Sequence, residues 1–132
     1  MPSPGGSDAR PKVLLVDDSM VVLRIASAYL SGRYEVITGT SGEEALRMAV
    51  AERPDVILMD FHMLGRNGAE TADWLGRDQR TNHIPVIIMT TASEMTLLPA
   101  HLDRLIKPFD RQAVLAKIQA CLGRPITKPV SE

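Results

Sequence analysis

Three short runs of consecutive apolar residues lie at wide intervals along the chain. They are Val13–Val16, Val56–Met59 and Val86–Met89. An uninterrupted run of this length is typical of a strand buried on both faces, as in a parallel sheet covered by helices. Two weaker segments, Tyr34–Thr38 and Leu105–Ile106, are predicted as further strands.

Segments with helical periodicity fill the gaps between these strands. The first predicted helix is capped by Ser19 and followed by Gly32, the second is capped by Ser41, the third covers 68–79 and the last is capped by Asp110. Glu44 stands three residues after Ser41, which is the spacing of a capping box. The expected inward faces carry Val22, Ile25, Ala26 and Tyr29, then Leu46, Ala49 and Val50, then Ala72 and Leu75, and finally Val114, Leu115, Ile118 and Leu122. The alternation predicts an α/β fold with right-handed crossovers.

The two ends of the chain differ from its middle in composition. Residues 1–10 are rich in Pro, Gly and Ser, and residues 124–132 contain two prolines and little apolar content. Both segments are predicted to be flexible tails around one domain at 11–123.

Composition and charge exclude several classes of protein. The formal net charge is −1, so no broad basic face for nucleic acid is expected. No apolar run approaches the roughly 20 residues that span a bilayer, and the first residues lack the features of a secretory signal. A cytoplasmic location is therefore expected. Cys121 is the only cysteine and lies on an apolar helical stripe, where a small buried hydrophobe is the expected role.

Polar residues directly follow four of the predicted strands. They are Asp17 and Asp18, then Asp60, then Thr90 and Thr91, then Lys107 and Pro108. In such folds ligands bind beyond the carboxyl ends of the strands, so these side chains are expected to converge. Two carboxylates about 4 Å apart repel by about 4 kcal/mol at an effective dielectric constant of about 20, which favours a bound cation. Ligands that are all oxygen favour Mg²⁺.

Asp60 has the chemistry of a phosphoryl acceptor, because a carboxylate can attack phosphorus and form an acyl phosphate. A metal ion and Lys107 would offset the charge of the incoming group. Each residue taken alone has a simpler interpretation: Asp17 as a helix cap, Asp60 as a turn residue, Thr90 as a cap and Lys107 as a solvated lysine. Their shared position after successive strands favours a common site.

Four segments resemble the signature segments of bacterial two-component response regulator receiver domains. They are LLVDDS at 14–19, VILMDFHMLGRNG at 56–68, IPVIIMTTAS at 84–93 and IKPF at 106–109. The resemblance covers 11–123 and is to single-domain, chemotaxis-regulator-like receivers. It implies a flavodoxin-like, doubly wound, five-stranded parallel sheet in the order 2-1-3-4-5, with helices on both faces.

The resemblance also implies a role for individual residues. Asp60 matches the phosphoacceptor, Thr90 the hydroxyl that moves toward the phosphoryl group and Lys107 the lysine that contacts it. The Mg²⁺ ligands would be Asp17, Asp18, Asp60 and the backbone carbonyl of His62. Pro108 would follow a cis peptide bond. The implied partners are a sensor histidine kinase or histidine phosphotransfer protein and a downstream protein target, without direct contact with nucleic acid or membrane, and the protein would be a monomer or weak dimer.

Several positions depart from the family's pattern. Leu64 replaces a common proline, Thr91 replaces a small residue, and Arg104 stands where the aromatic switch residue is usual. Residues 91–106 are too few for the usual helix and contain Pro99, so a fourth helix of about two turns or less, or an irregular segment, is expected. In the family, the surface formed by the fourth helix and the fifth strand is the common face for output and dimerisation. Dimerisation or signalling through this surface in the usual way is therefore not expected.

Three functions remain open from the sequence. The first is a phosphoryl switch that assists its own phosphoryl transfer and hydrolysis but is not an enzyme acting on external substrates. The second is a receiver-like docking module that works without phosphorylation. The third is a phosphatase with an aspartyl nucleophile, but such enzymes commonly need a second Asp where His62 stands. The His62 imidazole is expected to be an ordinary exposed loop histidine, with an influence on acyl phosphate hydrolysis as the alternative.

Overall fold

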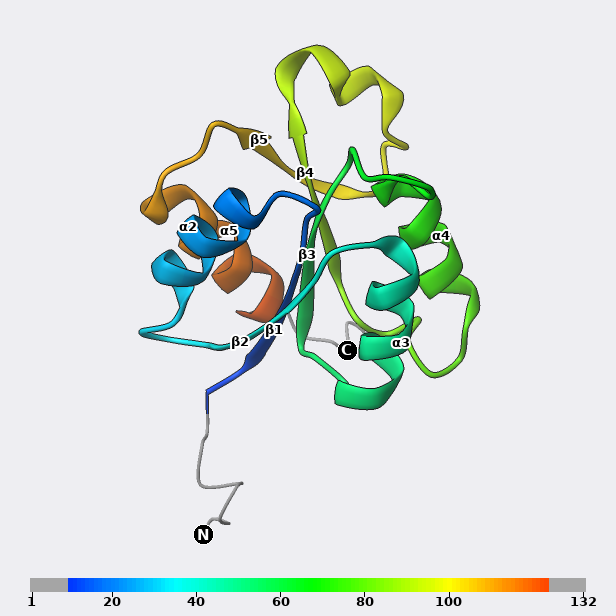
Figure 1. Cartoon of the computed structure of the whole chain (residues 1–132), viewed down its shortest axis with the longest axis horizontal. Helices are drawn as coiled ribbons and strands as arrows, with labels where there is room; N and C mark the ends of the chain where they lie inside the picture. The colour runs from blue at the N-terminus through cyan, green and yellow to red at the C-terminus, as the bar shows by residue number, and fades with distance from the viewer. Residues whose placement is uncertain (1–9, 124–132) are drawn as a thin grey trace, which may run out of the picture.

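Five parallel strands form the centre of the fold in the order β2-β1-β3-β4-β5, as predicted (Figure 1). The computed structural model describes residues 10–123. The strands are β1 (Lys12–Val16), β2 (Glu35–Gly39), β3 (Val56–Asp60), β4 (Val86–Thr91) and β5 (Asp103–Lys107). The second strand begins one residue later than expected, and the fifth is longer than its two-residue apolar centre.

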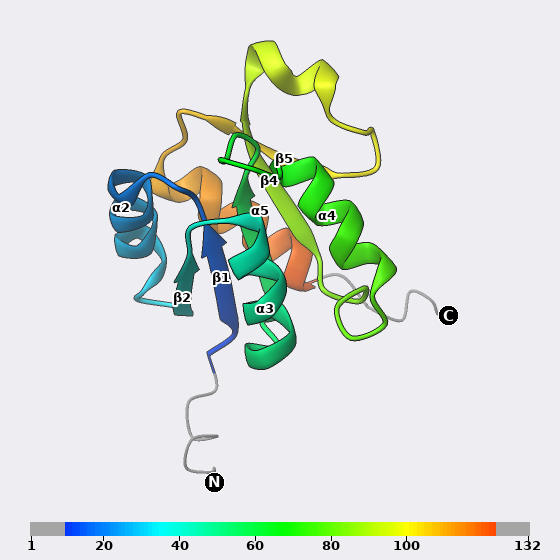
Figure 2. The ribbon, with the colours of Figure 1, turned by 45° about the vertical axis from the view of Figure 1, so that its right-hand side comes forward.

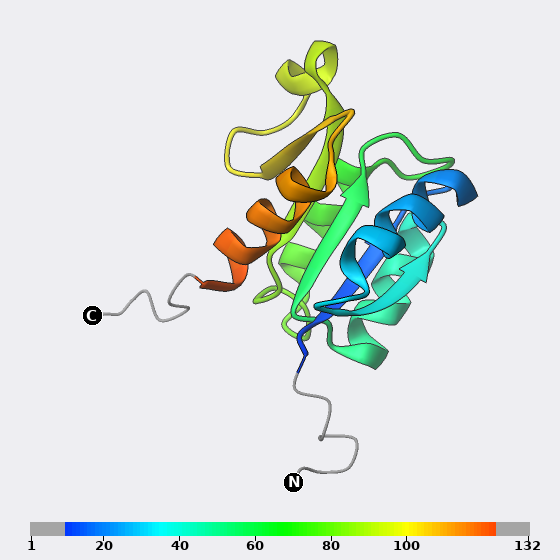
Figure 3. The same cartoon turned by 90° about the vertical axis from the view of Figure 1, so that its left-hand side faces the viewer.

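Helices cover both faces of this sheet. They are α2 (Met20–Leu30), α3 (Gly42–Glu52), α4 (Gly68–Arg77) and α5 (Arg111–Gly123). Figure 2 shows α3 and α4 in front of the sheet, and Figure 3 shows α2 and α5 on the opposite side. Successive strand residues point to opposite faces, so Val13 and Leu15 belong to the core beneath α2 and α5, whereas Leu14 and Val16 belong to the core beneath α3 and α4.

The predicted helix caps are present. Ser19 accepts a hydrogen bond from the Val22 amide at 3.3 Å, and Asp110 accepts one from the Ala113 amide at 2.8 Å. Ser41 likewise accepts one from the Glu44 amide at 3.1 Å. These contacts satisfy amide groups that have no partner within their own helices.

The capping box expected at Ser41 is not formed. The Glu44 carboxylate accepts a hydrogen bond from the Thr40 amide at 2.5 Å instead of the Ser41 amide. A complete capping box, which was not predicted, occurs at α4 between Asn67 and Glu70.

The prediction of which residues of α2 point inward is partly wrong. The buried residues are Leu23, Ala26 and Leu30. Ile25, expected on the inward face, is 49% exposed. The helix begins with a nearly continuous apolar run, so its periodicity does not single out one face.

The segment between β4 and β5 is short, as predicted. It contains a 3₁₀ helix, η1 (Ala92–Leu97), and projects beyond the carboxyl end of β4 (Figure 1). The Arg104 guanidinium donates hydrogen bonds to the backbone carbonyls of Met95 at 3.1 Å and Pro99 at 2.7 Å, and to that of Leu102. Arg104 therefore holds this segment through three backbone carbonyls, whereas an aromatic side chain has at most one hydrogen-bond donor.

The predicted tails lie outside the described residues, except for Arg10. Its guanidinium donates a hydrogen bond to the Ser31 carbonyl at 3.0 Å. Cys121 is buried in the core beneath α2 and α5, as expected for a small hydrophobe. Within residues 10–123, no helix has the length and apolar character needed to cross a membrane.

Candidate acidic site at the strand ends

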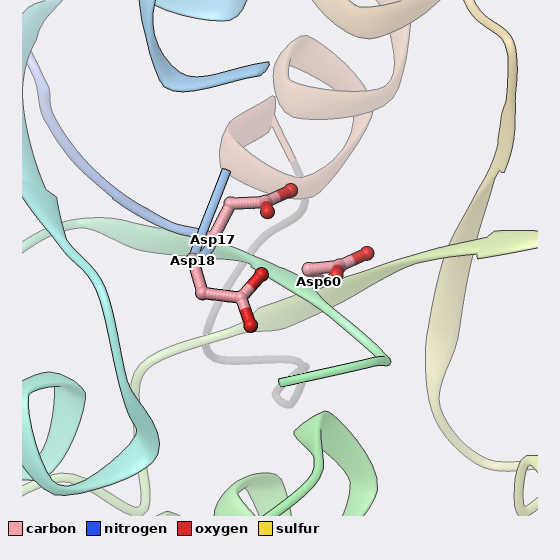
Figure 4. Close-up of side chains that lie close together, drawn as sticks. All are labelled: Asp17, Asp18 and Asp60. Carbon is pink, nitrogen blue, oxygen red and sulfur yellow. The ribbon is translucent and has the colours of Figure 1, made fainter. Parts of the chain in front are cut away.

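Three carboxylates meet at the carboxyl ends of β1 and β3 (Figure 4). Asp17 and Asp18 directly follow β1, and Asp60 is the last residue of β3. The two strands are paired so that Val16 lies beside Met59, which brings the three aspartates to one point. One carboxylate oxygen from each lies within 4.8 Å of the others. The predicted convergence of these residues is therefore present in the fold.

Lys107, at the end of β5, reaches into this cluster. Its ammonium donates a hydrogen bond to Oδ1 of Asp60 at 2.6 Å and lies 3.6 Å from Oδ2 of Asp17. The peptide bond between Lys107 and Pro108 is cis, as the resemblance implied. Burial lowers the pKa of the lysine, but its contacts with Asp60 and Asp17 outweigh that effect and hold the pKa above its ordinary value. Lys107 is thus a charged lysine.

The aspartates are held in an unfavourable environment. The Asp17 side chain is 2% exposed and the Asp60 side chain 8% exposed. Burial raises the pKa of both carboxyls, and the contacts with Lys107 oppose this effect only in part. Asp18 is exposed at the surface of the same cluster. One ammonium facing three carboxylates leaves the cluster with excess negative charge.

Asp17 is not the helix cap that its position in the sequence also allowed, because Ser19 caps α2. Its Oδ1 atom accepts a hydrogen bond from the Ser19 amide at 2.9 Å, just before α2. Its Oδ2 atom is buried and has no hydrogen-bond partner among the described residues. A buried acceptor without a partner costs about 1–3 kcal/mol, so this oxygen is suited to a metal ligand. The all-oxygen donor set and the excess negative charge fit a hard divalent cation such as Mg²⁺.

The loop after β3 closes the site on one side. Leu64, which replaces the usual proline, donates an amide hydrogen bond to Oδ2 of Asp18 at 3.3 Å. Gly65 has a φ of 80°, a conformation that favours glycine. His62 lies in this loop two residues after Asp60, which is the position expected for a carbonyl ligand. The backbone hydrogen bond from Leu64 ties the loop to the acidic cluster.

Gly68 packs beside the acidic site, at a position that the sequence did not single out. A Cβ atom at this residue would lie 2.5 Å from the Asp60 carbonyl oxygen and 3.0 Å from the Phe61 Cα. The Gly68 amide also donates a hydrogen bond to the Phe61 carbonyl at 2.8 Å. The absence of a side chain therefore lets the first residue of α4 pack against the backbone of Asp60. The signal in the sequence was a glycine directly after the helix cap Asn67.

Thr90 lies at the end of β4 and is 1% exposed. Its hydroxyl donates a hydrogen bond to Oε1 of Glu94 at 3.3 Å, and Oε1 also accepts one from the Thr91 amide at 3.3 Å. The other Glu94 oxygen contacts Nε2 of His62. The His62 side chain is 67% exposed, as expected, but it has a partner that the sequence did not indicate.

This chain is similar to known proteins along most of its length. Residues 13–119 match the model of the response regulator receiver domain. The chain is 35% identical to Protein PilH from Pseudomonas aeruginosa over 118 residues, covering 85% of this chain and 98% of that protein. Other curated relatives are longer, and the chain spans 25% of one and 50% of another.

Solved structures show the same fold. The chemotaxis response regulator CheY4 of Vibrio cholerae superposes with a TM-score of 0.75 at 32% identity, covering 86% of this chain and 99% of that one. The receiver domain of sensor histidine kinase PA1611 from Pseudomonas aeruginosa, with a magnesium ion coordinated in its active site cleft, gives a TM-score of 0.79 at 25% identity, covering 87% and 99%. The match over most of the chain, together with the acidic cluster at the strand ends, shows that this protein belongs to the response regulator receiver domains.

Proposed function

We propose that this receiver domain accepts a phosphoryl group on Asp60 from a histidine kinase or histidine phosphotransfer protein. The observation that carries the proposal is the buried carboxylate of Asp60, which lies 2.6 Å from the Lys107 ammonium and within 4.8 Å of two further carboxylates. Receiver domains are signalling modules rather than enzymes that turn over external substrates. A nucleophilic carboxylate beside a fixed positive charge suits phosphoryl transfer.

Mg²⁺ is the metal ion that this donor set fits. Asp17, Asp18 and Asp60 would hold it through carboxylate oxygens, together with the backbone carbonyl of His62. The unpartnered Oδ2 of Asp17 supports this assignment, as does the magnesium ion in the PA1611 receiver domain. When bound, Mg²⁺ would supply positive charge that offsets the negative charge on the phosphoryl oxygens.

Three residues of the chain have separate roles in the proposed phosphoryl transfer. An Asp60 oxygen forms a bond to phosphorus while the phosphorus–nitrogen bond of the donor breaks, and the electron pair stays on the imidazole nitrogen, which takes up a proton from solvent. Lys107 holds the other Asp60 oxygen and offers positive charge to the phosphoryl group. Thr90 would donate its hydroxyl hydrogen bond to a phosphoryl oxygen. Hydrolysis by water restores the Asp60 carboxylate and releases inorganic phosphate.

The rim of the site offers a surface for the phosphoryl donor. Met20 and Val21 begin α2, directly after the acidic pair, and are 63% and 67% exposed. Leu64, whose amide contacts Asp18, is 84% exposed. A protein that delivers a phosphoryl group to Asp60 must cover this rim, and the contact would remove these apolar side chains from water. We therefore assign the exposed apolar rim to the donor protein.

The test is phosphate incorporation measured by mass. The protein is incubated with a small acyl phosphate and Mg²⁺, and the expected result is the gain of one phosphate. Asp60→Asn should abolish the gain, while Asp73→Asn, at an exposed position on α4, should retain it. Folded wild-type protein that gains no phosphate would contradict the proposal.

The phosphorylation-independent docking module remains the alternative. Arg104 and the short η1 segment motivated it, but neither removes a member of the acidic site. A partner that binds wild type and Asp60→Asn with equal affinity would favour this alternative.

A further inference from the structure

Glu94 connects two parts of the site that come from different strands. One carboxylate oxygen accepts hydrogen bonds from the Thr90 hydroxyl and the Thr91 amide at the end of β4, each at 3.3 Å. The other oxygen contacts the His62 imidazole in the loop after β3. The Glu94 side chain is 20% exposed, so this bridge is partly shielded from water.

The charge of Glu94 strengthens this bridge. Partial desolvation raises the pKa of Glu94, but hydrogen bonds from His62 and Thr91 outweigh it and hold the pKa below its ordinary value. The group is therefore a carboxylate at neutral pH. A hydrogen bond to an ionised acceptor is stronger than one between neutral groups.

The Thr90 hydroxyl has a single proton to donate. In the structure that proton is directed to Glu94. A phosphoryl oxygen on Asp60 would be a second ionised acceptor for the same proton. The two acceptors therefore compete for Thr90, and one contact must be lost when the other forms.

We propose that Glu94 is a positioning residue that retains the Thr90 hydroxyl in the unphosphorylated protein and releases it when Asp60 is phosphorylated. This inference rests on the proposed function. Because Glu94 and the phosphoryl group compete for the same hydroxyl, every interaction that strengthens the contact between Glu94 and Thr90 weakens the affinity of the site for a phosphoryl group.

Release of the Thr90 hydroxyl by Glu94 also has a structural consequence, because of where Glu94 lies. Glu94 lies within η1, and the carbonyl of its neighbour Met95 is held by Arg104. Loss of the Thr90 contact removes one of the links between η1 and the site, while Arg104 still holds the Met95 carbonyl. The segment that lacks the usual aromatic switch residue is thereby coupled to the site through a carboxylate.

The test compares the affinity of the Mg²⁺-loaded protein for beryllofluoride, a phosphoryl mimic. Glu94→Ala should bind it about tenfold more tightly than wild type, the effect of losing one competing hydrogen bond to a charged group. Glu94→Gln retains an acceptor oxygen and should show a smaller gain. In a Thr90→Ala background, Glu94→Ala should give no further gain, because the two residues act through one contact.

Glu44→Ala is the matched control. Glu44 accepts hydrogen bonds from both the amide and the hydroxyl of Thr40, four residues earlier, which is the same spacing as between Glu94 and Thr90. Its contacts lie outside the proposed phosphoryl site, so its removal should leave beryllofluoride affinity unchanged. A melting curve of each variant measures the separate loss of local structure.

Three results would overturn the inference. The first is a beryllofluoride affinity of Glu94→Ala equal to that of wild type. The second is a gain in affinity from Glu94→Ala that is the same in the wild-type and Thr90→Ala backgrounds. The third is an equal gain in Glu94→Gln and Glu94→Ala, which would assign the effect to the charge of Glu94. The first of these results, together with a lowered melting temperature, would assign Glu94 a role in η1 structure alone. Wild-type protein that neither binds beryllofluoride nor takes up phosphate would contradict the proposed function itself.

Discussion

The Lys107 ammonium lies 3.6 Å from Oδ2 of Asp17, yet that oxygen is buried and accepts no hydrogen bond from the described residues. The same ammonium is closer to Asp60, at 2.6 Å. Lys107 thus interacts with two buried carboxylates, and its interaction with Asp17 is the weaker one because the distance is longer. The fold retains an ionised group at a position that does not stabilise it.

Asp17→Asn should therefore stabilise the protein in the absence of Mg²⁺. The asparagine retains the acceptor for the Ser19 amide and removes the buried charge, so unfolding free energy should rise by about 1–3 kcal/mol. Burial raises the pKa of Asp17 in the folded chain. The penalty on folding is consequently absent below the ordinary aspartate pKa, near 4, grows between that value and the raised pKa, and is fully present above the raised pKa.

Urea unfolding at a series of pH values measures this effect. The stability difference between Asp17→Asn and wild type should widen from about pH 4 toward neutrality, whereas Asp73→Asn should show no such trend. Added Mg²⁺ should stabilise wild type by mass action and stabilise Asp17→Asn much less. A difference that narrows as the pH rises would contradict the assignment of Asp17 as a buried carboxylate whose charge is only partly offset by Lys107.

Gly68→Ala should destabilise the protein, because the added methyl group would lie 2.5 Å from the Asp60 carbonyl oxygen. The expected loss is about 1–3 kcal/mol, the range for overpacking. Gly76→Ala is a matched control in the same helix, since a Cβ there meets no described atom within 4 Å apart from its chain neighbours and the nearby backbone of its own helix. The control should gain about 0.5–1 kcal/mol from helix propensity. Thermal melting distinguishes the two, and equal shifts would contradict the close approach of α4 to Asp60.

Arg104→Ala should loosen the segment between β4 and β5. The substitution leaves the carbonyls of Met95, Pro99 and Leu102 without their guanidinium donor. Hydrogen exchange of amides in residues 95–102 should accelerate, while exchange in β1 should be unchanged. Arg24→Ala, at an exposed position on α2, serves as the control. Unchanged exchange in 95–102 would show that the segment is held by other contacts.

Trp74 provides an internal probe of the loop after β3. The Arg66 guanidinium lies 3.2 Å from the centroid of its ring, and Trp74 is the only tryptophan in the chain. Arg66→Ala should cost about 0.5–1 kcal/mol of stability, as expected for a cation–π contact at a partly exposed site. Because the same loop carries His62 and Leu64, Mg²⁺ binding should change the Trp74 fluorescence in wild type and change it less in Arg66→Ala. An equal response in both would contradict this coupling.

The strand pattern and the helix caps were predictable because they depend on local sequence. Uninterrupted apolar runs such as Val13–Val16 identify buried strands, and Ser19 marks the start of a helix by its own side chain. The inward face of α2 was not predictable, because Met20 to Ile25 includes five apolar residues and several helical faces fit the pattern. Only packing against the sheet places Leu23 inward and Ile25 outward.

The sequence predicted those parts of the site that directly follow the strands. The order of the strands brings Asp17, Asp60 and Lys107 together, and that convergence followed from their positions after apolar runs; their functional roles remain predictions. Glu94 was missed because it is 32 residues from His62 and lies in a segment without regular periodicity. The requirement for glycine at position 68 depends on how closely α4 approaches the backbone of β3, which no local pattern encodes.

The sheet separates two cores, and the acidic site touches both of them. Phe61 and Met63, just after Asp60, belong to the core beneath α3 and α4, whereas Phe109, two residues after Lys107, packs on the core beneath α2 and α5. A change of charge between Asp60 and Lys107 therefore has a short covalent route of one to three residues into each half of the molecule. Mechanical transmission through the middle of the sheet is not required for either helical layer to respond.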